Sequence, residues 1–210
     1  MAEQRTVHIV DDEEAIRRST GFLLKTSGYR VATYASGTAF LKEAQSIEPG
    51  CVLLDVRMPD MDGHQVQQAM AQRGIGLPVI VLTGHGDVTI AIRAMKAGAV
   101  DFIEKPFEKS VLLAAIEAAF VRLDSSTGAA VAAASAILVI AGLTAREQDV
   151  LAGMAQGLPN KTIAYDLQIS PRTVEVHRAN LMTKLGVHSL SGALRIAFAA
   201  GLGTQAAIAI

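Results

Sequence analysis

The 210-residue sequence has a single cysteine, Cys51, no tryptophan, and only 4% aromatic and 19% charged residues. A single cysteine excludes a disulfide within the chain, so the fold does not depend on disulfides, and a reducing, cytoplasmic setting fits. Residues 1–6 are polar and lack the basic start and apolar stretch of a secretory signal peptide. We therefore expect a cytoplasmic protein that is stabilised by packing.

The sequence also has little net charge, because 19 basic residues nearly balance 20 acidic ones. Residues 1–124 hold 13 basic and 16 acidic residues, a net charge of −3, whereas residues 125–210 hold 6 and 4, a net charge of +2. The C-terminal part is therefore the better candidate for nucleic-acid binding. The apolar segment 129–141 is about 13 residues long, and a membrane span needs roughly 20, so we expect no membrane contact.

Strand and helix patterns alternate over the first 122 residues. Residues 51–55 form an apolar run that is typical of a strand buried on both faces. The predicted strands are 7–10, 30–34, 51–55, 78–83 and 101–104, and the predicted helices are about 14–27, 36–46, 63–73, 87–97 and 108–122. Five βα units in succession predict a doubly wound α/β fold, a parallel sheet with helices on both faces.

Polar residues follow four of these strands at their carboxyl ends. Asp11 and Asp12 follow the first strand, Asp55 ends the third, Thr83 ends the fourth, and Lys105 follows the fifth. Because these ends share one edge of a parallel sheet, we expect the five side chains to converge in a ligand crevice. Three carboxylates suit a hard divalent cation, while a hydroxyl and an ammonium can bond phosphoryl oxygens.

The aspartates after the first strand have a second explanation. Asp11 and Asp12 precede a predicted helix, where acidic residues cap the free N–H groups and interact favourably with the helix dipole. Taken alone, this pair leaves helix capping and metal binding equally open. The combination with Asp55, Thr83 and Lys105 favours a phosphoryl-transfer site over either feature alone.

Residues 5–122 resemble the receiver domain of two-component response regulators, a flavodoxin-like (βα)5 fold. The matching residues are Asp11, Asp12, Asp55, Thr83, Lys105, the turn 58–63 and the pair Lys105-Pro106. The resemblance implies that Asp55 accepts a phosphoryl group from a sensor histidine kinase, and that Lys105 and Thr83 bond phosphate oxygens. It also implies Mg²⁺ or Mn²⁺ bound by Asp11, Asp12, Asp55 and the backbone carbonyl of Arg57.

Two further residues carry implied roles with ordinary alternatives. Phe102 falls where the family places a switch aromatic that moves with Thr83, although it also fits an ordinary core position. The segment 83–87 resembles the FixJ-type subgroup, and Gly84 leaves room for a phosphoryl group. In this segment His85 is either a residue that tunes phosphoryl lifetime or a solvated loop residue.

Residues 123–142 break the composition and predict a linker between two domains. Residues 124–128 are turn-forming, and the alanine-rich segment 129–141 has high helix propensity and ends before Gly142. The receiver resemblance would place a charged linker here, so the apolar composition is a departure. The predicted helix has three possible contacts that the sequence leaves open, namely the first domain, the second domain or a partner chain.

Four helices are predicted from residue 143 onward. Thr144 and Glu147 form a capping-box pattern, and Ser170 followed by Pro171 marks the start of another helix. The predicted helices are about 144–155, 161–167, 171–185 and 189–200. The second and third are joined by a short turn, as in a helix-turn-helix.

Residues 143–202 resemble the LuxR-type helix-turn-helix DNA-binding domain, an all-α fold. The matching segments are 143–147, 160–164 and 173–177. In this arrangement the start of helix 171–185 reads base edges and flanking cations bond phosphates. The expected DNA contacts are Lys161, Arg172, Thr173, Glu175, Val176, His177, Arg178, Ala179 and Lys184. The alternative is a small protein-binding helical bundle, and the tail 203–210 lies outside the resemblance.

The two resemblances together imply a transcriptional response regulator of the NarL/FixJ family, with domains 1–122, 123–142, 143–202 and the tail 203–210. The expected partners are a histidine kinase, promoter DNA, RNA polymerase and a second copy bound through residues 87–104. We expect a switch with at most self-catalysed phosphorylation and dephosphorylation.

An enzyme alternative is a haloacid-dehalogenase-type phosphatase, which also uses an aspartate as its nucleophile. Such enzymes have a second aspartate two residues further on, where this chain has Arg57. A phosphorelay module without DNA output is the remaining alternative.

Overall fold

The computed structural model describes residues 4–84, 88–124, 128–187 and 189–203. By its internal contacts the chain divides into two units. Unit 1 consists of Met1–Asp87 and Ala97–Ser126, and unit 2 consists of Val88–Lys96 and Thr127–Ile210. The segment Val88–Lys96 therefore groups with the C-terminal helices, although it lies between two strands of unit 1 in the sequence.

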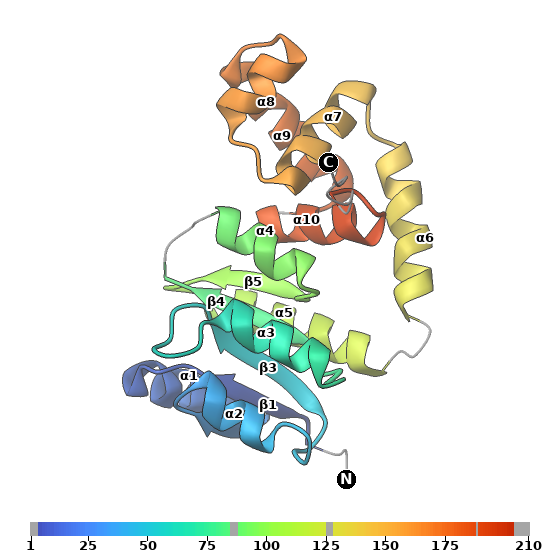
Figure 1. The fold of residues 1–210 in the computed structure, drawn as a ribbon. Helices are drawn as coiled ribbons and strands as arrows, with labels where there is room; N and C mark the ends of the chain where they lie inside the picture. Colours follow the sequence, from blue (N-terminus) through green and yellow to red (C-terminus); the bar gives the residue numbers. More distant parts are fainter. Residues whose placement is uncertain (1–3, 85–87, 125–127, 188, 204–210) are drawn as a thin grey trace. The chain divides into compact units, whose positions relative to one another are not determined.

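Unit 1 is built on a five-stranded parallel sheet with the order β2-β1-β3-β4-β5 (Figure 1). The strands are β1 (Thr6–Val10), β2 (Arg30–Tyr34), β3 (Gly50–Asp55), β4 (Val79–Thr83) and β5 (Asp101–Glu104). Its helices are α1 (Glu14–Thr26), α2 (Gly37–Glu43), α3 (Gly63–Gln72) and α5 (Lys109–Asp124). This order confirms the predicted flavodoxin-like fold. The chain reverses its winding between β1 and β3, and ligands bind at such switch points beyond the carboxyl ends of the strands.

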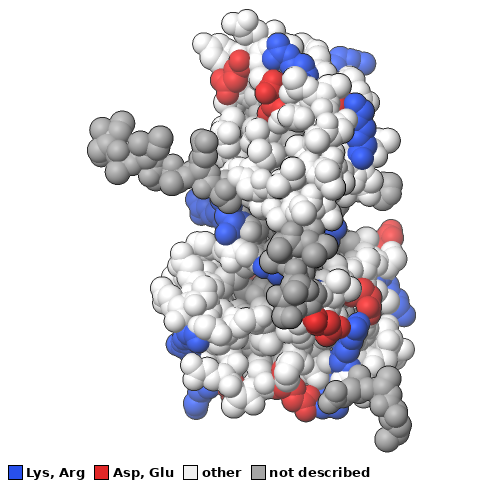
Figure 2. All heavy atoms as spheres, turned by 90° about the vertical axis from the view of Figure 1, so that its right-hand side faces the viewer, with Lys and Arg blue, Asp and Glu red and all other residues white. Residues whose placement is uncertain are grey.

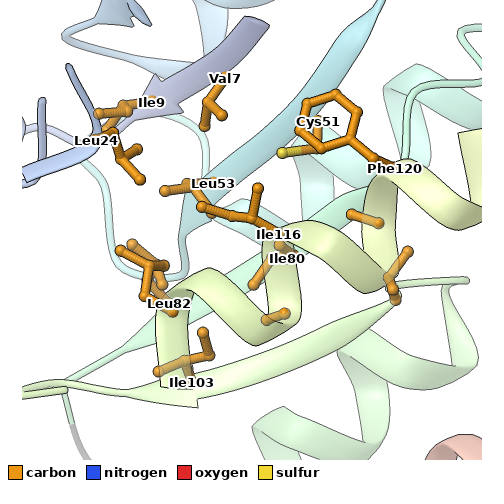
Figure 3. Packing of buried hydrophobic residues seen from close by; sticks show 14 residues of the cluster. Val7, Ile9, Leu24, Cys51, Leu53, Ile80, Leu82, Ile103, Ile116 and Phe120 are labelled. Carbon is orange, nitrogen blue, oxygen red and sulfur yellow. The ribbon is translucent and has the colours of Figure 1, made fainter. Parts of the chain in front are cut away.

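One face of the sheet packs against α1 and α5. Alternate residues of a strand point to the same side, so Val7 and Ile9 of β1 lie with Cys51 and Leu53 of β3. Figure 3 shows these side chains together with Ile80, Leu82, Ile103, Leu24, Ile116 and Phe120. Cys51 is fully buried in this cluster, which confirms its interpretation as a packing residue.

The other face of the sheet lies toward α2 and α3, which pack on each other. Phe40 of α2 and Val66 and Met70 of α3 are buried. At the start of α3, Asp62 accepts a hydrogen bond from the Gln65 N–H at 2.7 Å, and its own N–H donates to the Gln65 side chain at 2.9 Å. This capping box fixes the helix start beside the end of β3.

Unit 2 consists of helices in the part of the chain that the structure describes. They are α4 (Val88–Lys96), α6 (Gly128–Ala141), α7 (Ala145–Gln156), α8 (Asn160–Leu167), α9 (Pro171–Leu185) and α10 (Leu190–Ala199). Both α4 and α6 pack against α10. None of the described helices of the chain combines the length and the apolar character needed to span a membrane.

The helices α7, α8 and α9 pack on one another around a small core. Buried members of this core are Val150, Leu151, Met154, Ile163, Val174, Leu181 and Leu185. The predicted caps are present, because Thr144 accepts from the Glu147 N–H at 3.3 Å and Ser170 accepts from the Thr173 N–H at 3.1 Å. Between α8 and α9, Gln168 adopts a left-handed conformation at φ 56°, which makes the tight turn of a helix-turn-helix.

Most predicted elements end within one or two residues of the observed bounds. The helix predicted at 36–46 is shorter in the structure, because α2 ends at Glu43 and the next residues form a turn. Helix α5 runs to Asp124, two residues beyond the predicted end of the receiver. A helix occupies Gly128–Ala141, where 129–141 was predicted. Residues 125–127 of the predicted turn, Asp87 and the tail 204–210 lie outside the described residues.

Candidate functional site

The carboxyl edge of the sheet brings together one cation and two carboxylates. Lys105 Nζ lies 2.6 Å from Asp11 Oδ2 and 2.5 Å from Asp55 Oδ1. The three residues come from the ends of β5, β1 and β3. The Asp11 side chain is fully buried, and those of Asp55 and Lys105 are 9% and 12% exposed. Ion pairs this buried require close geometry to offset desolvation, and each of these contacts has it.

The second oxygen of each aspartate is held by the backbone two residues further on. Asp11 Oδ1 accepts from the Glu13 N–H at 2.9 Å, and Asp55 Oδ2 accepts from the Arg57 N–H at 2.7 Å. Both carboxylates are therefore fixed at both oxygens. At Gly63, a Cβ would lie 2.5 Å from the Asp55 carbonyl oxygen, so only glycine lets α3 begin this close to the site.

Electrostatics keep Lys105 charged in this cluster. Burial alone lowers the pKa of its ammonium, but the hydrogen bonds to Asp11 and Asp55 outweigh burial, and the pKa is raised above its ordinary value. Burial raises the pKa of the Asp55 carboxyl, and the charge of Asp11 acts in the same direction against Lys105. One ammonium thus serves two carboxylates, so the cluster attracts further positive charge.

The remaining predicted receiver residues have different surroundings. Thr83 is buried at the end of β4, and its carbonyl oxygen accepts from the Lys105 N–H at 2.6 Å. Phe102 is half-buried in β5, next to Val81 of β4. Among the described residues, a Cβ at Gly84 would meet only Arg57 Nη2, at 3.7 Å, so packing against these residues does not demand glycine there. His85 lies outside the described residues.

Asp12 is exposed, and its position depends on a residue that the sequence reasoning missed. Arg17 of α1 donates from Nη1 to the carbonyl oxygens of Asp11 at 2.8 Å and Asp12 at 2.7 Å. No motif marks Arg17 for this role. The signal available was only its position in the first turn of the helix that follows the acidic pair, as the fourth residue of α1.

The donor set fits a magnesium ion in its chemistry. Among the described residues, no three acidic, histidine or cysteine side chains are arranged as a complete metal cage. Mg²⁺, however, uses only one or two carboxylates together with waters and phosphate oxygens. Asp11 and Asp55 bond the same ammonium, so both carboxylates are within reach of a single cation.

Helix α9 separates a buried side from an exposed side, as the sequence predicted. Val174, Leu181 and Leu185 are buried. The exposed predicted contacts are Lys161 of α8 and Arg172, Glu175, Val176, Ala179 and Lys184 of α9, and the half-buried ones are Thr173, His177 and Arg178. Val176 is 53% exposed, so its side chain is accessible on the surface of α9.

Two of the predicted phosphate contacts are already bonded within unit 2. Lys184 Nζ lies 2.8 Å from Glu147 Oε2, and Arg178 Nη1 donates to Asn160 Oδ1 at 2.7 Å. The Lys184 ammonium and the Thr144 N–H together lower the pKa of Glu147 to about 2. Sequence reasoning assigned Glu147 only to the capping box and missed both pairs. Lys161 and Arg172 have no partner among the described residues.

Charged groups are sparse over the surface that Figure 2 shows. Uncharged residues make up most of this face, and Lys or Arg side chains alternate with Asp or Glu side chains without a large patch of one sign. This distribution agrees with the 19% charged content. The face in this view therefore presents no broad basic surface.

Two family models match the sequence over the regions just described. The response regulator receiver domain matches residues 7–117, and the luxR family of bacterial regulatory proteins matches residues 141–197. Together they define a class, a receiver joined to a LuxR-type helix-turn-helix domain. The fold and the buried aspartate-lysine cluster have the features of the first, and α7 to α10 those of the second.

Relatives of known function extend over nearly the whole chain. The transcriptional regulatory protein FixJ of Rhizobium meliloti (strain 1021) is 49% identical over 198 residues, 94% of this chain and 97% of the relative. The tetrathionate response regulatory protein TtrR of Salmonella typhimurium (strain LT2) is 43% identical over 90% of each chain. The chain therefore belongs to the transcriptional response regulators of two-component systems, a family that works with histidine kinases and promoter DNA rather than as conventional enzymes.

Solved structures show the same similarity. Full-length FixJ from B. japonicum has a TM-score of 0.58 and 42% sequence identity, and the match covers 95% of this chain and 98% of that one. The structure of FixJ-N matches 56% of this chain at a TM-score of 0.54 and 50% identity. The predicted resemblance to FixJ-type regulators is confirmed.

Proposed function

We propose that Asp55 is the phosphoacceptor of this response regulator. The observation that carries the proposal is the Asp11-Lys105-Asp55 cluster at the carboxyl edge of the sheet, in a chain that also has a helix-turn-helix. A carboxylate is a competent nucleophile toward phosphorus once nearby charge is neutralised. In the transfer, one Asp55 oxygen forms a bond to phosphorus while the bond from phosphorus to the kinase histidine nitrogen breaks.

The neighbouring residues support this step in separate ways. Asp11, Asp12, Asp55 and the Arg57 carbonyl would hold Mg²⁺ or Mn²⁺, which would supply charge neutralisation for the phosphoryl oxygens. Lys105 exchanges its bond to Asp55 for one to a phosphoryl oxygen, and the Thr83 hydroxyl bonds another. The same geometry accounts for self-catalysed phosphorylation by small donors and for later hydrolysis.

The switch couples this bond formation to the output helices. Thr83 moves toward the phosphoryl group, and the half-buried Phe102 turns into the space that Thr83 leaves. Receivers then pair through residues 87–104. Helix α4 packs against α10 within unit 2, so pairing through α4 competes with that contact and changes unit 2.

DNA binding follows from helix α9 in the major groove. Arg172, Glu175 and Val176 are placed to meet base edges, and Lys161 is placed to meet a phosphate. Two paired copies double the net +2 charge of the C-terminal part and read two half-sites. Promoter binding in the cytoplasm and contact with RNA polymerase complete the proposed transcriptional role.

A single comparison tests phosphorylation, coupling and output. The full chain and its Asp55→Asn variant are incubated with Mg²⁺ and a small phosphodonor, and then measured by sedimentation and by DNA binding. We expect the wild type alone to dimerise and gain DNA affinity. A fully phosphorylated wild type that stays monomeric would contradict pairing through residues 87–104. A phosphorylated dimer without DNA binding would favour the phosphorelay module instead.

A further inference from the structure

Arg17 makes an unusual contact with the loop that carries the acidic pair. Its Nη1 atom lies 2.8 Å from the Asp11 carbonyl oxygen and 2.7 Å from the Asp12 carbonyl oxygen. The guanidinium therefore bonds two consecutive peptide groups from a fixed position on α1. Such a bond restrains the backbone between the end of β1 and the start of α1.

The Arg17 guanidinium bonds the backbone carbonyl oxygens of Asp11 and Asp12 and not their carboxylates. It therefore does not compete with other groups for the two carboxylates. The Asp11 carboxylate accepts hydrogen bonds from Lys105 Nζ and from the Glu13 N–H. The Asp12 carboxylate has no bonded partner in the described part of the chain and is exposed. A cation that paired directly with Asp12 would compete with a metal, whereas Arg17 holds the loop without using that ligand.

We propose that Arg17 is a positioning residue for the divalent cation. By tying both carbonyl groups to α1, it holds Asp11 and Asp12 in the orientation from which they bind Mg²⁺. The inference rests on the proposed phosphoacceptor function, and it assigns a role to a residue that touches neither metal nor phosphate. It also explains why a positive side chain stands beside a cation site, where simple electrostatics disfavours it.

This role and plain electrostatics predict effects of opposite sign. Removing a positive charge near a cation site strengthens cation binding if charge alone matters. Removing a group that orders the ligands weakens cation binding, typically by 10–100-fold for outer-shell partners. The sign of the change in Mg²⁺ affinity therefore distinguishes the two explanations.

The experiment compares Arg17→Ala with Arg18→Ala in the full chain. Arg18 is the next residue of α1 and carries the same charge, and its only ion pair among the described residues is an exposed one with Glu14 at 3.7 Å. Binding of Mg²⁺ alone is measured by calorimetry and by the amide NMR signal of Glu13, whose N–H bonds Asp11. We expect Arg17→Ala to bind Mg²⁺ about tenfold more weakly and Arg18→Ala to bind as the wild type or slightly better.

Thermal unfolding without Mg²⁺ separates positioning from general loss of structure. If Arg17→Ala does not unfold cooperatively, Arg17→Lys takes its place, since it keeps the charge but loses the planar guanidinium, and it should also bind more weakly than the wild type. Unchanged or tighter Mg²⁺ binding in a folded Arg17 variant would overturn the inference and leave the proposed function intact. Failure of the wild type to bind Mg²⁺ would count against the proposed function itself.

Discussion

The functional groups of this protein lie in two opposite environments. One is the receiver cluster, formed by Asp11, Asp55 and Lys105, and the other is the α9 surface, the exposed side of helix α9. At the receiver cluster, the side chains of Asp11 and Lys105 are 0% and 12% exposed, and every carboxylate oxygen of Asp11 and Asp55 has a partner. On α9, Arg172 and Glu175 are exposed, and Arg172 has no partner among the described residues. The receiver site is built from several strands, whereas the α9 surface comes mostly from one helix.

This difference shows how each region is adapted to its task. A buried cluster gains electrostatic strength from its low-dielectric surroundings, so one misplaced charge changes its chemistry greatly. An exposed surface is screened by solvent and salt, and its contacts act nearly independently. Single substitutions should therefore have all-or-none effects in the receiver and graded effects on DNA binding.

The largest expected effect is in the receiver. Asp55→Asn should abolish acid-labile phosphorylation by a small phosphodonor, because an amide is a poor nucleophile and lacks the anionic oxygen that binds the metal. The matched control is Asp60→Asn in the exposed turn that follows β3. Phosphate incorporation measured after the donor reaction should be normal in the control, and normal labelling of Asp55→Asn would refute the site.

On α9, Glu175→Ala should change sequence preference. A carboxylate in the major groove accepts from a cytosine amino group, so its loss should cost roughly 1–3 kcal/mol of discrimination at one base pair. Competition binding with a panel of site variants measures this change. Asp166→Ala removes the same charge from α8 and should leave the preference as it is; a uniform affinity change in both variants would place Glu175 away from the bases.

Lys161→Ala should have a smaller, sequence-independent effect. Loss of one phosphate contact releases about one fewer counterion, so the slope of log affinity against log salt should flatten by about one unit. Binding isotherms at several salt concentrations give the slope. Arg195→Ala on α10 is the charge-matched control. An equal slope change in the control would mean that only net charge is being measured.

The smallest expected effect concerns pH and Glu147. Its pKa is lowered to about 2 in the folded state by Lys184 and the Thr144 N–H, so its ionised form stabilises unit 2 above the unfolded pKa of about 4.3. That stabilisation is lost as pH falls from about 5 toward 2. Melting temperatures of Glu147→Gln should vary less over this range than those of the wild type.

The control for this pH effect is a carboxylate with weaker contacts. Within the described part of the chain, the only ion pair of Asp149 is an exposed one with Arg146 at 3.7 Å, and surface pairs of this kind contribute little. Asp149→Asn should therefore keep the wild-type pH profile. A Glu147→Gln profile that also matches the wild type would mean that the Glu147-Lys184 pair does not contribute to the stability of unit 2.

The predictable features of this fold depend on local patterns and on a topological rule. The apolar runs ending in Asp55 and Thr83 predicted β3 and β4, and parallel strands necessarily share one edge, which predicted that Asp55 and Lys105 would meet. The capping signals at Thr144 and Ser170 predicted where α7 and α9 begin. The helix end at Glu43 was missed because helix termini depend on contacts that periodicity does not record.

The sequence by itself determined the fold class, the caps and the identity of the residues at the sheet edge, because these follow from periodicity and short-range chemistry. Only the tertiary structure decided that Arg17 bonds the Asp11 and Asp12 carbonyls, that Lys184 pairs with Glu147, and that α4 packs against α10. These contacts depend on how each helix is rotated and placed relative to its neighbours. That rotation is set by packing summed over many side chains, so no single motif specifies it.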